Sequence, residues 1–336
     1  MTGDDMVLNH RKNRIFAKNS PMRKILIVDR VHPLLAEQLE SHGFHCEINK
    51  ELTHDGFVAL PDEYDGLIIR SRFAVDAAAI DSKPQLRFVV RIGSGMENID
   101  TQYAESKGVK CLSTPEGNAN AVAELCLTFL LTALRQVANA DREVRVGEWL
   151  REKNKGTELA SHTVGIIGYG HTGPAFAKLL KALGSKVLCY DRYRQHYGDE
   201  NATAVTLEEL FEQCDVISLH INYLPENHYF INKDLIQKIK HPFIFLNTSR
   251  GWAVNTGDVL TAIKEGKIKY ACFDVLEYET SRLQISPKDE WDAVMRELAE
   301  TDCVLLTPHV GGQTLEAERR HAEIAVEKIV AVSGEL

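Results

Sequence analysis

Short apolar runs alternate with helix-period segments along most of the chain. In the first third, the runs predicted as buried strands are residues 24–29, 46–49, 66–70, 88–92 and 109–112. In the remainder they are residues 164–167, 186–190, 215–220, 243–249, 270–275 and 303–307. Because strands alternate with helices, the predicted fold class is α/β, with two doubly wound parallel-sheet domains.

Longer helical patterns are predicted for residues 32–42, 118–142 and 314–332. Residues 118–142 are apolar over most of the helix circumference, which predicts a buried helix. A second subunit is a plausible burial partner, so we expect a homodimer through this segment. The last helix is expected to pack back on the first α/β unit.

The most specific local motif is a glycine-rich turn between a strand and a helix. The turn reads GYGHTG and holds Gly168, Tyr169, Gly170, His171, Thr172 and Gly173. The first glycine permits a tight turn, the second lets the backbone approach a pyrophosphate, and the third lets the helix pack closely on the sheet. The helix N-terminus favours an anion. This order predicts that the turn binds a dinucleotide.

Asp191 ends the strand that follows this helix, as the motif requires. Its carboxylate can accept hydrogen bonds from both ribose hydroxyls and would repel a 2′-phosphate. NAD is therefore expected in preference to NADP, although Arg192 and Arg194 weaken that preference.

The length of 336 residues allows two domains. We expect a substrate (catalytic) domain with a flavodoxin-like sheet, formed by residues 22–116 plus 310–336. A Rossmann domain, residues 117–309, is inserted in it. Residues 1–21 are polar, lack the apolar core of a signal peptide and are expected to form a disordered extension.

Hydrophobic residues make up 44% of the chain and charged residues 26%, as in soluble globular proteins. The net charge of −9 argues against a nucleic-acid partner. No apolar run is long enough to span a membrane, so no membrane partner is expected. The seven cysteines are scattered without metal-ligand spacing, which favours reduced thiols in a cytoplasmic protein and no metal site.

Four polar clusters stand at predicted strand ends, where an open parallel sheet binds its ligands. They are RIGSGMENID at 91–100, NTSRG at 247–251, DVLEYE at 274–279 and TPHVGG at 307–312. In this order the clusters resemble the D-isomer-specific 2-hydroxy acid dehydrogenase family, and most of all its short D-3-phosphoglycerate dehydrogenases. The resemblance covers nearly everything after residue 22 and implies an NAD-dependent oxidoreductase.

The resemblance also implies a catalytic set. Arg250 would bind the substrate carboxylate with its planar fork and polarise the adjacent carbonyl. His309 would exchange a proton with the carbonyl oxygen. Glu279 would hydrogen-bond the imidazole and raise its pKa, and family spacing from Asp274 favours it over Glu277.

Further contacts follow from the same resemblance. Asp274 would meet the nicotinamide carboxamide. The remaining cofactor contacts would be His220, which opens the loop HINYLPEN, together with Thr248 and Gly311. The loop departs from the family at Asn222, where proline is usual, so its contact with the cofactor stays open.

The substrate would be a small 2-oxo or 2-hydroxy acid. Ser94 and Gly95 would offer backbone N–H groups to its carboxylate. The sequence RSR, which is Arg70, Ser71 and Arg72, ends a strand of the first domain, and two arginines there suit a second anion such as phosphate. Arg70 is common across the family, so Arg72 carries this inference, and a solvent-facing Arg72 is an equal alternative.

Residues 287–300 look helical where many relatives have a proline-rich loop. Trp291, Val294, Met295 and Leu298 share one face. The segment joins two predicted catalytic residues, so it is expected either to cover the mouth of the cleft or to be a packed surface helix.

The resemblance thus implies a dehydrogenase acting on 3-phosphoglycerate and 3-phosphohydroxypyruvate, a reaction of serine biosynthesis. The alternative substrates are glyoxylate and hydroxypyruvate. A third hypothesis is an NAD-sensing corepressor, since some relatives retain the catalytic residues in that role. Because the chain ends at Leu336, no C-terminal regulatory domain and no serine feedback are expected.

Overall fold

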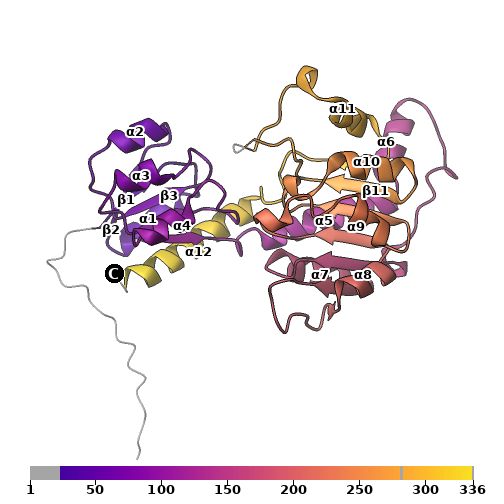
Figure 1. The fold of residues 1–336 in the computed structure, drawn as a ribbon, viewed down its shortest axis with the longest axis horizontal. Coiled ribbons are helices and arrows are strands. Elements are labelled where there is room, and N and C mark those ends of the chain that lie inside the picture. The colour runs from indigo at the N-terminus through magenta and orange to yellow at the C-terminus, as the bar shows by residue number, and fades with distance from the viewer. Residues whose placement is uncertain (1–22, 281–282, 335–336) are drawn as a thin grey trace, which may run out of the picture.

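The computed structural model describes residues 23–280 and 283–334, which form two parallel sheets flanked by helices (Figure 1). The predicted extension, residues 1–21, lies outside the described residues. Each sheet is doubly wound, as the alternation of apolar runs and helical patterns predicts.

The first sheet has the strand order β2-β1-β3-β4-β5, and all its pairings are parallel. Its strands are β1 (Arg23–Ile27), β2 (Phe44–Ile48), β3 (Gly66–Ile69), β4 (Phe88–Arg91) and β5 (Lys110–Ser113). The helices between them are α1 (Leu34–Ser41), α2 (His54–Ala59), α3 (Ala77–Asp81) and α4 (Thr101–Ser106). Alternate residues of β1 enter cores on opposite faces, Ile25 and Ile27 on one side and Leu26 on the other. Burial on both faces explains the uninterrupted apolar runs of residues 25–28 and of β3.

The second sheet has the order β12-β11-β10-β9-β6-β7-β8, again with all pairings parallel. Its strands are β6 (Thr163–Ile167), β7 (Lys186–Tyr190), β8 (Thr203–Ala204), β9 (Val216–Leu219), β10 (Phe243–Asn247), β11 (Ile268–Phe273) and β12 (Val304–Leu306). The strand order reverses between β6 and β9, and such a switch point is where ligands bind in this architecture.

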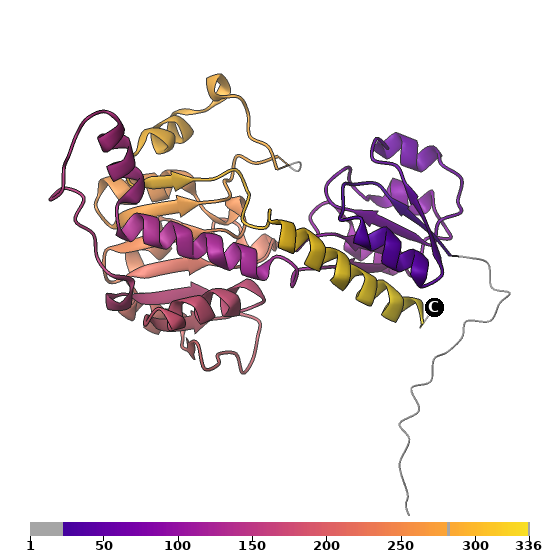
Figure 2. The same ribbon diagram turned by 180° about the vertical axis from the view of Figure 1, so that it is seen from behind.

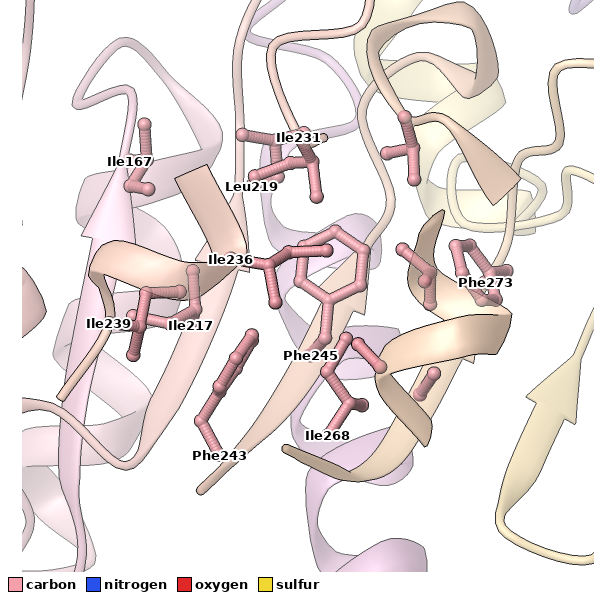
Figure 3. Close-up of a cluster of buried hydrophobic side chains, with 14 of the residues drawn as sticks. Ile167, Ile217, Leu219, Ile231, Ile236, Ile239, Phe243, Phe245, Ile268 and Phe273 are labelled. Carbon is pink, nitrogen blue, oxygen red and sulfur yellow. The ribbon is translucent and has the colours of Figure 1, made fainter. Parts of the chain in front are cut away.

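Helices cover both faces of the second sheet. They are α5 (Ala119–Leu134), α6 (Val137–Arg145), α7 (Thr172–Ala182), α8 (Leu207–Gln213), α9 (Lys233–Lys238), α10 (Thr256–Lys264) and α11 (Ala293–Glu300), with 3-10 turns η1 (Leu159–Ser161), η2 (Pro225–Asn227), η3 (Gly251–Ala253) and η4 (Lys288–Glu290). Figure 3 shows Phe243, Phe245 and Phe273 in the core on one face, and Ile244 joins the core on the other. The central strands of this sheet are therefore buried on both faces.

The last helix, α12 (Leu315–Ser333), returns to the first sheet. Figure 2 shows it beside α1, and Ala322, Ala325, Val326 and Ile329 are buried in the same core as the strands of that sheet. The beginning and the end of the chain therefore share one hydrophobic core.

The prediction of one helix over residues 118–142 was wrong. The helix breaks at Gln136, whose φ of 53° places it in the left-handed region, and α5 and α6 meet at 61°. Helix α5 is mostly buried against α7 of the same chain, whereas α6 has no buried residue. Within the described residues no single helix could cross a membrane, although α5 and α6 together meet the length and composition criteria.

The segment 287–300 is a short 3-10 turn followed by α11. Met295 and Leu298 are buried in the core of the second sheet, and Trp291 and Val294 pack against that core. The apolar face therefore packs against α10 and β12. This geometry agrees with the packed surface helix, and the cover over the mouth of the cleft stays a prediction.

Candidate active site

The glycine turn 168–173 connects β6 to α7, and two of its glycines are required by close backbone contacts. Gly168 has a φ of 96°, and a Cβ there would lie 2.3 Å from the His220 carbonyl oxygen. A Cβ on Gly173 would lie 2.5 Å from the Gly168 carbonyl oxygen. A Cβ on Gly170 would meet no atom within 4 Å, so space remains above this residue at the start of α7. The turn is therefore closed toward the sheet and open toward a ligand.

Asp191, directly after β7, is held by backbone N–H groups from two sides. Its Oδ2 accepts from Tyr169 N at 2.8 Å, and its Oδ1 accepts from Tyr193 N and Arg194 N at 2.9 Å each. The Tyr169 side chain is buried and donates to Asp199 at 2.9 Å. Tyr169 therefore offers its backbone and not its ring to the open side of the turn.

The other members of the predicted turn and its neighbouring strand end differ in exposure. His171 is exposed and Thr172 begins α7. His220 follows β9 and shares a hydrogen bond of 2.8 Å with Ser218 Oγ. Burial lowers the pKa of His220 to about 4, so this ring is neutral at physiological pH.

Asp274, at the end of β11, organises the loop that carries His309. Its side chain is buried and accepts from Thr307 Oγ1 at 2.6 Å, Val310 N at 2.8 Å and Gly311 N at 2.8 Å. Its backbone carbonyl accepts from His309 N at 2.8 Å. One carboxylate and one carbonyl thus fix the whole segment 307–311 to the neighbouring strand.

His309 itself is oriented by Glu279. Their side chains lie 2.7 Å apart, His309 Nδ1 to Glu279 Oε2, and they are 25% and 15% exposed. The other Glu279 oxygen accepts from Leu276 N at 2.6 Å, so the carboxylate cannot swing away. The rival Glu277 accepts from Thr256 N instead. The imidazole is therefore fixed through Nδ1, which leaves Nε2 for another partner.

Arg250 follows β10 and reaches the first domain. Its Nη1 donates to the Ser249 carbonyl oxygen at 2.7 Å, and its Nε donates to Glu97. Gly95 lies directly under this pair, since a Cβ there would be 2.2 Å from Arg250 Nη2. Thr248, two residues before, contacts the thiol of Cys126 at 3.1 Å. The predicted carboxylate-binding residues of the two domains are therefore in contact.

The RSR segment after β3 is anchored by a buried acid. Asp29 Oδ2 accepts from the backbone N–H groups of Arg70, Ser71 and Arg72 at 2.6, 3.0 and 3.1 Å. The Arg72 side chain donates to the Val28 carbonyl oxygen at 3.0 Å and lies 3.6 Å from Asp29 Oδ1. Within the described part of the chain the Arg70 guanidinium has no hydrogen-bond or ion-pair partner. Arg72 is thus already partnered, and Arg70 is the freer cation.

Sequence reasoning missed two charged residues of this site, Arg91 and Glu97. Arg91 ends β4, and its Nε is buried without a hydrogen-bond partner among the described residues. Burial lowers the pKa of Arg91 to about 10. Both residues flank the glycines of RIGSGMENID, so charged residues beside a glycine loop at a strand end were the available signal. Ser94 was predicted, and its hydroxyl donates to Asn118 at 2.9 Å.

Comparison with known proteins finds relatives that cover most of the chain. The family model of the D-isomer specific 2-hydroxyacid dehydrogenase NAD-binding domain matches residues 127–311. The chain is 36% identical over 300 residues to the hydroxypyruvate reductase of Thermotoga maritima, covering 89% of this chain and 95% of the relative. It is 33% identical to the D-3-phosphoglycerate dehydrogenase of Methanocaldococcus jannaschii, covering 94% of this chain but only 58% of the relative. The structure of D-2-hydroxyisocaproate dehydrogenase superposes with a TM-score of 0.79 at 26% identity, covering 92% of this chain and 96% of that one.

The fold and the match place the protein among the oxidoreductases that use a nicotinamide cofactor. It belongs to the D-isomer specific 2-hydroxyacid dehydrogenase family. The chain is therefore an NAD-dependent D-2-hydroxyacid dehydrogenase. The predicted family, fold class, cofactor and enzyme class are confirmed.

Proposed function

We propose that Arg250, Glu279 and His309 form the catalytic set of a dehydrogenase acting on a phosphorylated substrate, 3-phosphoglycerate or 3-phosphohydroxypyruvate. The observation that supports the catalytic set is the 2.7 Å contact between His309 and Glu279, on a loop fixed by Asp274 at the carboxyl edge of the second sheet. We also propose the domain boundaries given above, residues 22–116 plus 310–336 and residues 117–309.

The residues of the second sheet fit NAD. Gly170 leaves open space at the N-terminus of α7, where a pyrophosphate is favoured, and Asp191 stands at the end of β7 for a ribose. Asp274 Oδ2 receives one hydrogen bond and keeps capacity for a carboxamide donor. NAD(H), when bound, supplies or accepts the hydride.

The chain's own residues supply the remaining requirements of the reaction. Arg250 and the backbone of Ser94 and Gly95 would bind the substrate carboxylate and fix the carbonyl carbon. His309 Nε2 would give its proton to the carbonyl oxygen during reduction and take it back during oxidation. Glu279 would stabilise the cationic imidazole through Nδ1 and keep the ring in one orientation.

A cationic surplus favours the phosphorylated substrate. Four arginines lie at this edge, and within the described residues the acids that face them are Asp29 and Glu97. The arginines are Arg70, Arg72, Arg91 and Arg250. A phosphate adds about −1.5 to −2 charge at neutral pH, which suits such a surplus. One observation favours hydroxypyruvate or glyoxylate instead. Arg72 is already engaged by Val28 and Asp29, so Arg70 would have to provide the second anion site.

The experiment is to follow NADH oxidation with 3-phosphohydroxypyruvate, hydroxypyruvate, glyoxylate and pyruvate. We expect the highest kcat/KM for the phosphorylated acid. Arg70→Gln should raise its KM roughly tenfold while changing the KM for glyoxylate much less. Arg72→Gln should raise it by less, because Arg72 is already engaged by Val28 and Asp29. Arg319→Gln, which removes an exposed arginine of α12, is the matched control. A higher kcat/KM for hydroxypyruvate would replace the proposed substrate and leave the catalytic set in place.

We further propose that the chain forms a homodimer through residues 118–142 in the cytoplasm. What supports the dimer is α6, which buries none of its residues and exposes Val137 and Val144. Trp149, in the segment that follows, is 75% exposed. The molecular mass in solution, measured by sedimentation, tests this assembly.

A further inference from the structure

Glu97 is a carboxylate that contacts the residue proposed to bind the substrate's carboxylate. It lies in the loop between β4 and α4 of the first sheet, and it accepts a hydrogen bond from Arg250 Nε of the second. The two side chains are 28% and 23% exposed, so the pair is partly shielded from water. The pair joins residues that are 153 positions apart and links the two domains.

The Glu97 carboxylate lies where the substrate's carboxylate is expected to bind. A Cβ on Gly95 would lie 2.0 and 2.5 Å from the two Glu97 oxygens and 2.2 Å from Arg250 Nη2. Both carboxylate oxygens and Arg250 Nη2 therefore sit against the Gly95 backbone. A substrate carboxylate held by Arg250 and the Gly95 backbone would need the same space.

The surroundings favour the ionised form of Glu97 and offer it a second partner. Burial alone would raise the pKa of Glu97, but the charge and the hydrogen bond of Arg250 hold it below the ordinary value. Arg91 lies close enough to favour the same charge, and its Nε lacks a partner among the described residues. The charge of Arg91 would therefore also favour a carboxylate displaced from Arg250.

We propose that Glu97 occupies Arg250 while no substrate is bound and yields this guanidinium to the substrate's carboxylate, so that Glu97 sets the affinity and charge selectivity of the site. The inference rests on the proposed role of Arg250. Glu97 is a positioning residue, because it acts through Arg250. Its negative charge weakens the binding of every 2-oxo acid, and it weakens most the binding of one that carries a second anion.

The test compares Glu97→Gln with the wild-type enzyme. Glutamine keeps the shape and loses the charge, so the KM for the 2-oxo acid should fall roughly three- to tenfold. The decrease should be larger for 3-phosphohydroxypyruvate than for glyoxylate. The kcat should stay within about twofold, and so should the KM for NADH. Glu97→Asp restores the charge on a shorter side chain and should give a KM between the two.

The matched control is Glu63→Gln, which removes the same charge from an exposed pair with Lys24 in the same domain. A rise in KM or a fall in kcat in Glu97→Gln would show that Glu97 supports Arg250 and does not compete with substrate. An unchanged KM would show that the pair has no role in binding. Both results overturn the proposal.

Equilibrium binding separates this proposal from the proposed function. Oxamate, a 2-oxo acid analogue that cannot be reduced, is titrated into the NADH-loaded enzyme by calorimetry. Tighter oxamate binding by Glu97→Gln supports the proposal even if none of the four acids is turned over. Equal oxamate binding overturns it even if 3-phosphohydroxypyruvate is the substrate.

Discussion

Polar side chains lie at the carboxyl ends of the strands in both sheets, which we call the first edge and the second edge. The two edges differ in how many of these side chains already have hydrogen-bond or ion-pair partners within the chain. At the second sheet, the side chains of Asp191 and Asp274 each accept three hydrogen bonds from neighbouring segments of the chain, and Glu279 holds His309. At the first sheet, the Arg70 guanidinium and Arg91 Nε lack partners among the described residues. The second edge is fixed before any ligand binds, whereas the first edge keeps cationic groups that an anion can satisfy.

This difference assigns the two parts of the reaction to different edges. Proton transfer needs a group held in one orientation, and preorganised hydrogen bonds provide this. Selection among acids needs charges whose interactions change when substrate binds. Glu97 and Arg250 connect the two edges, so the charge of the first edge acts directly on a residue of the second.

The largest effect is expected at His309. His309→Asn should lower kcat by about 10³-fold, because asparagine cannot exchange the proton. His309 has a φ of 55°, and asparagine tolerates this left-handed conformation, so the loop should keep its shape. His196 has the same φ of 55° on an exposed loop, which makes His196→Asn a matched control with kcat unchanged. A Kd for NADH that rose as much as kcat fell would instead show that the loop had collapsed.

The strands and the glycine turn were predictable from sequence because both depend on local patterns. Apolar runs such as residues 243–247 are buried on both faces, and Gly168 and Gly173 meet backbone atoms close in sequence or in the adjacent strand. The break at Gln136 was not predictable in this way, since neither glycine nor proline marks it. The ion pair of Glu97 and Arg250 joins two domains, and no local pattern encodes such a contact. The sequence therefore did not predict the contacts between distant residues or the turn that lacks glycine and proline.

A smaller effect, on stability, is expected when Asp274 is replaced. It shows how much the hydrogen bonds of this carboxylate stabilise the second edge. Asp274→Asn places an NH₂ group against one of three donors, so the free energy of unfolding should fall by about 2 kcal/mol. The kcat should fall as well, because the loop carries His309. Chemical denaturation and steady-state kinetics measure the two effects. Asp302→Asn, at an exposed pair with Arg142, should change stability by less than about 0.5 kcal/mol. Equal stability of the two variants would contradict the idea that Asp274 fixes the edge.

The last effect appears only at acidic pH and concerns His321, a residue of α12 that supports the first edge. His321 is 6% exposed, and its Nδ1 lies 2.7 Å from Thr114 Oγ1, which accepts a hydrogen bond from Gly93 N at 2.9 Å. The threonine hydroxyl and His321 Nδ1 share a hydrogen bond whose donor depends on the imidazole tautomer. Burial, followed by the charge of Arg70, lowers the pKa of His321 from 6.5 to about 4. The imidazole thus connects α12 through Thr114 to the loop that carries Gly93 and Glu97.

The sign of the pH dependence follows from this lowered pKa. Between pH 6.5 and about 4 the unfolded chain binds a proton at this histidine and the native protein does not, so the stability contributed by His321 is complete above pH 6.5 and is lost as the pH falls. About 2 kcal/mol of this stability should be lost by pH 5. His321→Gln should flatten the stability profile over this range, whereas His42→Gln, at an exposed histidine, should leave it unchanged. His220 also has a pKa of about 4, so the variant should keep part of the slope, which then comes from the second edge. If His321→Gln kept the full pH dependence of stability seen in the wild type, burial and the charge of Arg70 would not lower the pKa of His321 in the folded protein.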